Sequence, residues 1–219
     1  MFYAGRKKLL VGTEGFQPYL IIGMIETENR KLLRKAVLEF MNDIKNDKLY
    51  NTIPSITTAK GWYVHARGDH PEIRIKFFEM LRGLGGYKAD IVIAKKDLNI
   101  FNRKHNNSPT EFYFDVLYHL IERKLSDSNC EHMLYLSQRG NNSLGDFQKA
   151  VDKTLIANHT LANPINYKLE VVPGSEMPEL SIIDYLIWAV QRKLLKNEAR
   201  YFEALEDKYR VVLNLYDNT

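Results

Sequence analysis

Short β-branched runs alternate with stretches of helical periodicity along this chain, and this alternation most limits the folds open to it. Extended runs predict strands at residues 19–25, 62–66, 89–94, 133–137 and 167–172. Helical spacing and capping residues predict helices at 30–44, 69–83, 110–125, 143–158, 179–196 and 200–215. Residues 45–61, with Asn, Asp, Pro and Gly as punctuation, and the polar stretch 99–109 are predicted as loops. This order is typical of a layered α/β domain with parallel pairing in part of the sheet.

The start of the predicted helix at 69–83 carries its own signal. Asp69 precedes Pro71, which suits a first turn, and Glu72 stands three residues after Asp69 as in a capping box. Thr110 is predicted to cap the helix at 110–125 in the same way. We therefore interpret Asp69 and Glu72 as caps.

The composition indicates a single domain over residues 1–219. The chain has 45% hydrophobic residues, which is enough for a large core. Its one cysteine, Cys130, excludes an internal disulfide and fits a reducing compartment. No signal peptide is evident, and the longest apolar run, 185–190, is too short for a membrane span. The sequence predicts a cytoplasmic protein without a membrane partner.

The charge permits a polyanionic partner without requiring one. The net charge is +4, because 31 basic residues are offset by 27 acidic ones. A nucleic-acid surface would have to come from local clustering. Lys95 and Arg139 each follow a predicted strand, and Arg192 lies on a late helix, so these three are the candidate phosphate contacts. The sequence has no glycine-rich phosphate loop, no Cys/His zinc pattern and no Gly-x-Ser-x-Gly elbow.

The helix predicted at 179–196 contains the most informative side chain. An apolar stripe follows helical spacing through Leu180, Ile183, Ile187, Val190 and Leu194. Asp184 is the only charged residue from 180 to 190 and projects within about 60° of that stripe. A carboxylate beside a buried stripe is costly unless a cation, metal or strong donor meets it. Two interpretations stay open: Asp184 binds a divalent metal at the sheet edge, or it pairs with an arginine or points to water.

His65 is the second candidate. It lies near the end of the strand predicted at 62–66, where α/β sheets place their sites. Imidazole titrates near neutral pH, so His65 could serve as metal ligand or general base. The alternative is a histidine that only hydrogen-bonds the following turn.

Four polar residues share one side of the helix predicted at 110–125: Glu111, Asp115, His119 and Glu122. Their spacing suits metal ligands on one helix face. The opposite side is apolar, so the row is interpreted as the solvated face of an amphipathic helix.

Three segments resemble the bacterial domain-of-unknown-function 3800 family. They are ELSIIDYLIWAVQR at 179–192 with RYF at 200–202, WYVHA at 62–66, and LSQRG at 136–140. The resemblance implies an α/β, ribonuclease H-like three-layer domain with a central mixed sheet flanked by helices. It also implies that Asp184 is the late-helix acid and His65 the family's histidine. In the nuclease hypothesis that follows from this, Glu179 is a weaker helper. Asp184 and His65 would then hold Mg²⁺ or Mn²⁺ for phosphodiester chemistry.

The chain differs from the family pattern at two places. Family members open with a strand reading Asp-Glu-Ser-Gly, which residues 1–15 lack, and no acid stands at 136–138. An absent opening strand would leave a sheet edge that favours a homodimer. Three functions follow as hypotheses: a metal-dependent nuclease, an impaired homologue that binds nucleic acid without cutting it, and a protein-interaction module in mobile-element or phage-defence biology.

Overall fold

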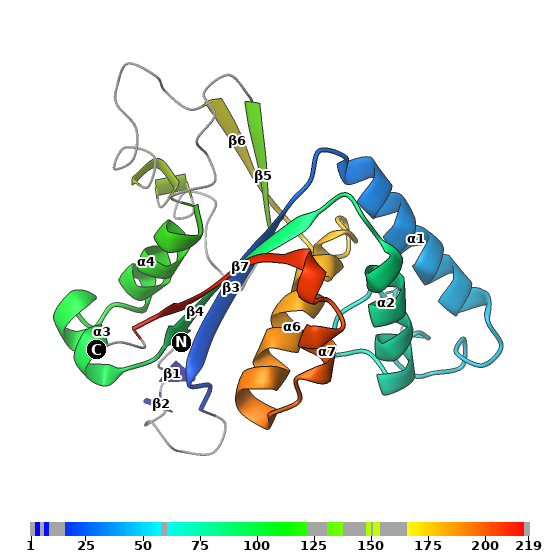
Figure 1. Cartoon of the computed structure of the whole chain (residues 1–219), viewed down its shortest axis with the longest axis horizontal. Helices are drawn as coiled ribbons and strands as arrows, with labels where there is room; N and C mark the ends of the chain where they lie inside the picture. Colours follow the sequence, from blue (N-terminus) through cyan, green and yellow to red (C-terminus); the bar gives the residue numbers. More distant parts are fainter. Residues whose placement is uncertain are drawn as a thin grey trace.

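The computed structural model describes residues 16–57, 61–121, 131–137, 148–149, 151–153 and 166–216, together with the backbone of Tyr3–Ala4 and Lys7–Lys8. The strands are β1 (Tyr3–Ala4), β2 (Lys7–Lys8), β3 (Tyr19–Glu26), β4 (Lys88–Lys95), β5 (Glu131–Ser137), β6 (Asn166–Val172) and β7 (Tyr209–Leu215). The helices are α1 (Arg30–Asn46), α2 (Pro71–Gly83), α3 (Leu98–Lys104), α4 (Pro109–Ile121), α6 (Leu180–Lys196) and α7 (Arg200–Glu203), with a short 3₁₀ turn at Glu206–Lys208. The protein is therefore a mixed α/β structure (Figure 1).

A mixed sheet in the order β3-β4-β7 lies at the centre. Strand β3 runs antiparallel to β4, with Tyr19 opposite Lys95, and β4 runs parallel to β7. Arg210 on β7 ties the strands together, because its guanidinium reaches both Asp90 on β4 and Glu26 on β3. Asp90 is 2% exposed, so this guanidinium compensates a buried carboxylate.

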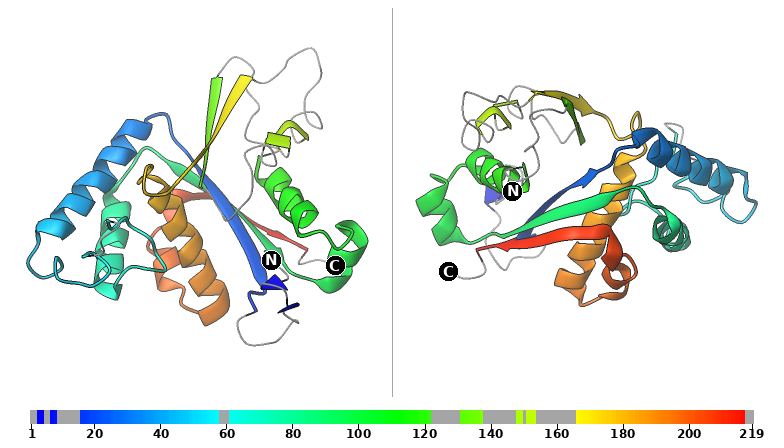
Figure 2. Two further views of the ribbon diagram at one scale, coloured as in Figure 1. Left: turned by 180° about the vertical axis from the view of Figure 1, so that it is seen from behind. Right: turned by 45° about the horizontal axis from the view of Figure 1, so that its top comes forward.

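Helices cover both faces of this sheet. Side chains of successive strand residues point to opposite faces, and Ile22, Val92 and Ala94 pack with the apolar face of α4. Their neighbours Ile21, Ile91 and Ile93 pack with α6 on the other face. Figures 1 and 2 show α3 and α4 on one side of the sheet and α6, α7, α2 and α1 on the other. The predicted mixed sheet flanked by helices is confirmed.

Strands β5 and β6 form a separate parallel pair, with Glu131 opposite Asn166 and Ser137 opposite Val172. Alternate side chains of this pair, among them Leu134 and Leu169, pack onto the cluster around α4. The predictions of β3, β4, β5, β6, α1 and α6 agree with these elements. Of the helix predicted at 143–158, the described residues 148–149 and 151–153 are helical, and the others lie outside the described part of the chain.

Helix α6 approaches β3 at a glycine. A Cβ added to Gly23 would lie 2.5 Å from Ile91 Cδ1 and 2.9 Å from Ile183 Cδ1. The absent side chain therefore allows the first turns of α6 to sit close to the sheet.

Three predictions of secondary structure are wrong. Residues 98–104 form helix α3, because the Asp97 side chain accepts the Asn99 and Ile100 backbone N–H groups and caps it. Residues 209–215 form strand β7, although a helix was predicted to Leu215. Parallel hydrogen bonding to β4 decides this, and it suits the β-branched Val211 and Val212.

The third error concerns residues 62–66, which form no strand: 62–65 have no regular secondary structure and Ala66 begins a turn. Buried Trp62, Val64 and Ala66 alternate with exposed Tyr63 and His65, which is the pattern that predicted a strand. Carboxylates rather than a neighbouring strand accept the N–H groups at the end of this segment, as described below.

Two predictions about α4 also need correction. The helix begins at Pro109, and the hydroxyl of Ser108 rather than Thr110 accepts the Glu111 N–H. The face with Asp115 is not fully solvated, because the side chain of Asp115 is only 20% exposed. Its carboxylate accepts hydrogen bonds from Lys104 and Tyr216 and contacts the buried His105 ring. These partners hold the pKa of Asp115 below its usual value against the opposing effect of burial.

Candidate active site

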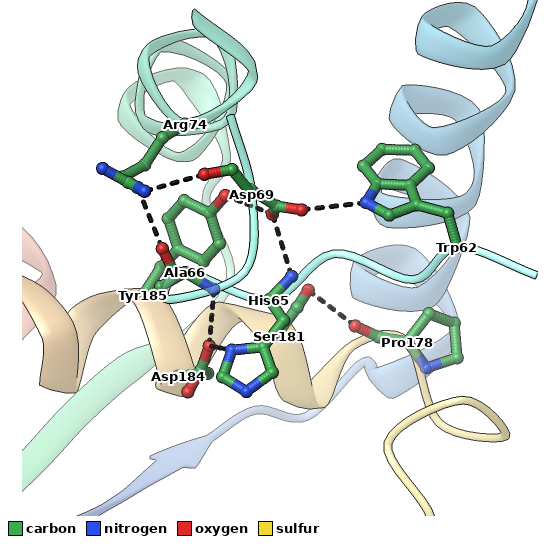
Figure 3. A network of polar contacts seen from close by, with 9 residues as sticks. All are labelled: Trp62, His65, Ala66, Asp69, Arg74, Pro178, Ser181, Asp184 and Tyr185. Atoms are coloured by element: carbon green, nitrogen blue, oxygen red, sulfur yellow. Dashed lines mark hydrogen bonds and ion pairs between the residues drawn. The ribbon is translucent and has the colours of Figure 1, made fainter. Parts of the chain in front are cut away.

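A buried carboxylate organises the segment that carries His65. Asp69 is 4% exposed and accepts three hydrogen bonds: Trp62 Nε1 at 2.8 Å, the His65 backbone N–H at 2.9 Å and the Tyr185 hydroxyl at 2.6 Å. Arg74 on α2 donates to the backbone carbonyls of Ala66 and Asp69 at 2.9 and 2.7 Å. Figure 3 shows these bonds converging on the turn that follows His65. The turn is thereby joined to both α2 and α6.

The sequence indicated Asp69 as the N-cap of α2, and this prediction is wrong. His70 holds that position, and its side chain accepts the Glu72 N–H at 3.5 Å. Burial raises the pKa of the Asp69 carboxyl, and this effect outweighs the three donors, which lower it. Sequence reasoning missed this residue because its donors come from positions as distant as Tyr185.

Asp184 lies in the second turn of α6, on the part of that turn that is not fully buried. On one side of it, Ile183 and Ile187 pack toward the sheet, and on the other Tyr185 is fully buried. The predicted stripe is only partly correct, since Leu194 is 37% exposed. Asp184 stands between the two buried faces, and its side chain is 36% exposed.

The structure brings the two main sequence candidates together. Asp184 Oδ2 accepts the Ala66 backbone N–H at 2.8 Å and lies 3.0 Å from His65 Nδ1 (Figure 3). The consecutive N–H groups of His65 and Ala66 thus bind two different carboxylates, Asp69 and Asp184. Asp184 therefore pairs with the imidazole of His65 and with the backbone of the turn, and not with the arginine that the sequence left open.

This pair defines what His65 can do. The hydrogen bond to Asp184 raises the pKa of His65, while partial burial and the charge of Arg67 oppose the rise. In the neutral ring, the bond to Asp184 favours the proton on Nδ1 and leaves the Nε2 lone pair available. The His65 side chain is 46% exposed, so Nε2 can meet a ligand. The arrangement is that of a histidine acid–base group oriented by a carboxylate.

A surface hollow of about 220 Å³ adjoins His65. It is lined by Ser55, Gly61, Trp62, Tyr63, His65, Gly68 and Asp69. The Tyr63 and His65 rings lie 6.1 Å apart at its wall. A small group bound there would touch both an aromatic ring and the imidazole.

Glu179, predicted as a helper, does not join this pair. Its buried side chain receives a hydrogen bond from Arg34 at 3.1 Å and faces Arg30 at 3.7 Å, both on α1. It makes no hydrogen bond or ion pair with His65 or Asp184. The arginine partner considered for Asp184 thus belongs to Glu179, which links the start of α6 to α1.

The described residues do not fit a two-metal site. Within the described ranges, no group of three or more His, Cys, Asp or Glu side chains could hold a metal ion. The His65–Asp184 pair supplies one carboxylate, and its Oδ2 atom already accepts two hydrogen bonds. Two-metal phosphodiester cleavage with Mg²⁺ requires several clustered oxygen ligands.

The predicted phosphate contacts have different surroundings. Lys95 is exposed at the end of β4, opposite Tyr19. Arg192 lies over the Trp188 ring and forms a two-point ion pair with Glu198, with Nε 2.9 Å from Oε2. Arg139 lies outside the described residues.

Comparison with known proteins found no matching family model, no matching curated protein and no matching solved structure. No helix in the described part of the chain is both long enough and apolar enough to cross a membrane.

The His65–Asp184 bond predicts an elevated histidine titration. We expect the His65 ring to titrate above pH 6.5 in an NMR pH series, and its midpoint to fall in Asp184→Asn because the favourable charge is lost. The raised pKa also means that the pair stabilises the fold fully below the unfolded value of about 6.5 and that this stabilisation is lost as pH rises through the folded value. An unchanged His65 midpoint in the variant would disprove the coupling.

Proposed function

We propose that this protein is a nuclease or phosphodiesterase of ribonuclease H-like type, with His65 as its acid–base group and Asp184 as the residue that orients it. The observation that carries this proposal is the 3.0 Å contact between His65 Nδ1 and Asp184 Oδ2 at an exposed edge of α6. A mixed sheet covered on both faces, with an acid on a late helix packed against it, supports the ribonuclease H-like assignment.

The chemistry requires one proton acceptor and one proton donor. His65 Nε2 takes a proton from water as its oxygen bonds to phosphorus, and the P–O ester bond breaks. The leaving oxygen, which lies on the opposite side of the phosphorus in an in-line displacement, takes its proton from solvent, and the imidazolium releases its own proton to solvent. Asp184 stays ionised throughout and stabilises the imidazolium, as the carboxylate does in serine-protease triads. Mg²⁺ or Mn²⁺, if it takes part, would supply charge neutralisation at the phosphate.

Cleavage of labelled nucleic acids tests the proposal. Single- and double-stranded DNA and RNA would be incubated with the full chain in Mg²⁺, Mn²⁺ or EDTA, beside Asp184→Asn. We expect the wild type to cut at least one substrate and the variant to be about 10²–10⁴-fold slower, because asparagine keeps an acceptor for the Ala66 N–H but loses the charge. Equal rates for both proteins would remove Asp184 from the mechanism.

A second candidate is nucleic-acid binding without cleavage. The specific observation behind it is that, among the described residues, Asp184 is the one carboxylate paired with the His65 ring, whereas two-metal nucleases gather several. Salt-dependent binding with no cleavage under any metal condition would favour it.

A further inference from the structure

A stripe of side chains leads from Asp184 to the end of α6. Trp188, Arg192 and Lys196 follow Asp184 at intervals of four residues, so each lies about one turn beyond the last. Twelve residues of helix rise about 18 Å. The candidate acid–base pair thus stands at one end of a row that contains an aromatic ring and two cations.

This row borders a hollow of about 320 Å³. Its lining consists of Gln17, Arg67, Trp188, Gln191, Arg192, Leu195 and Lys196. Arg67 comes from the turn directly after Ala66, whose N–H binds Asp184. The hollow and the His65–Asp184 pair therefore share the same turn and the same helix.

The floor of the hollow is held in position before any ligand arrives. The guanidinium carbons of Arg74 and Arg192 lie 4.7 and 5.3 Å from the Trp188 ring centre. Glu198 fixes Arg192, and the Gln191 amide bonds Gln17 at 3.1 Å. Little side-chain entropy then remains to be lost when a ligand binds this floor.

Two cations at the rim are not held by other side chains in this way. Arg67 and Lys196 are exposed, and neither makes a hydrogen bond or ion pair within the part of the chain that the structure describes. Among the described residues that line the hollow, three are cations and none is acidic. Since Glu198 compensates only Arg192, the other two cations favour an anionic ligand.

The shape of the hollow decides among anionic ligands. A single strand bends readily and can lower its phosphates into a concave site beside a tryptophan, whereas a duplex is stiff over about 150 base pairs. A lipid surface is flat and would meet only the rim. The row of about 18 Å is long enough for several nucleotides.

We propose that this hollow binds the phosphates of a single-stranded nucleic acid and directs the strand along α6 toward His65. Arg67 and Lys196 make the phosphate contacts that the fold leaves open, and Arg192, held by Glu198, lines the hollow beside Trp188. The direction toward His65 rests on the proposed function, but the binding itself does not.

Binding and cleavage would be measured separately. Anisotropy of labelled 12-mers of dT and U with the full chain gives affinity across a salt series, with Arg67→Gln/Lys196→Gln as the test variant. We expect the double variant to bind at least tenfold more weakly and to lower the slope of log affinity against log salt by about 1.4, since each single-strand contact contributes about 0.7. Lys48→Gln, an exposed lysine after α1, is the matched control and should change neither quantity.

The proposal would be overturned if the control and the double variant had equal effects on affinity, or if the double variant left the salt slope unchanged. Tighter binding of a duplex than of the single-stranded 12-mer, or binding of thymidine monophosphate as tight as that of the 12-mer, would also overturn it. So would binding of acidic vesicles without binding of oligonucleotides. Binding lost in the double variant, with no cleavage by the wild type, would retain this site and reject the nuclease. Cleavage abolished by Asp184→Asn, with 12-mer binding unaffected by the double variant, would retain the nuclease and reject this site.

Discussion

Replacing His65 by asparagine is expected to lower the phosphodiester cleavage rate by about 10²–10⁴-fold, the usual contribution of a positioned acid–base group. Asparagine cannot accept the proton of the attacking water near neutral pH. The Ala66 N–H keeps its bond to Asp184, so the turn should keep its conformation. Single-turnover rates at saturating enzyme would measure the loss without interference from product release.

The pH dependence separates a chemical role of His65 from a structural one. A general base must be neutral, so the wild-type rate should rise as pH passes through the raised pKa of His65. The midpoint should move down in Asp184→Asn, parallel to the NMR titration. A uniform fall in rate at every pH, with an unshifted midpoint, would contradict the acid–base assignment.

His70→Asn is the matched control for this experiment. His70 is exposed and caps α2, and asparagine is itself a favoured N-cap, so the change should leave both fold and rate intact. If His70→Asn slowed cleavage as much as His65→Asn did, the effect would come from the turn rather than from the imidazole.

The largest expected effect on stability belongs to Asp69. Asp69→Ala removes the acceptor of the Trp62 indole, the Tyr185 hydroxyl and the His65 N–H, two of which belong to buried side chains. Buried donors left without partners cost 1–3 kcal/mol each, so we expect a loss of roughly 3–5 kcal/mol in the free energy of unfolding. The thermal midpoint should fall by roughly 10 °C, at about 2–4 °C per kcal/mol for a chain of this length.

Urea titration of the variants would test this estimate. Asp69→Asn should fall between wild type and Asp69→Ala, because its amide oxygen keeps one acceptor while its NH₂ group opposes a donor. Asp43→Ala, at an exposed site on α1, controls for removal of a carboxylate. A loss for Asp69→Ala no larger than for Asp43→Ala would show that the three donors find other partners.

The candidate residues followed from local features of the sequence, but their arrangement did not. Asp184 stood out as the one charge beside an apolar helical stripe, and His65 as an imidazole near the end of an alternating segment. Neither pattern predicts that the two residues are in contact. They lie far apart in the chain and meet only when α6 packs against the turn after His65. The role of Asp69 is the clearest case: its spacing to Glu72 matches a cap, yet burial against Trp62 and Tyr185 makes it the centre of a network.

The sequence by itself determined the elements whose residue pattern reports their own burial. These are strands β3 and β4, which are mostly apolar runs, and helices α1 and α6 with their stripes. Only the tertiary structure decided the fate of segments whose conformation depends on a distant partner. Residues 209–215 became a strand because β4 offers a free edge, and residues 62–66 stayed unpaired because Asp69 and Asp184 accept the N–H groups of His65 and Ala66. Side-chain periodicity records which face is buried, whereas backbone hydrogen bonds are satisfied by whichever acceptor the fold brings near.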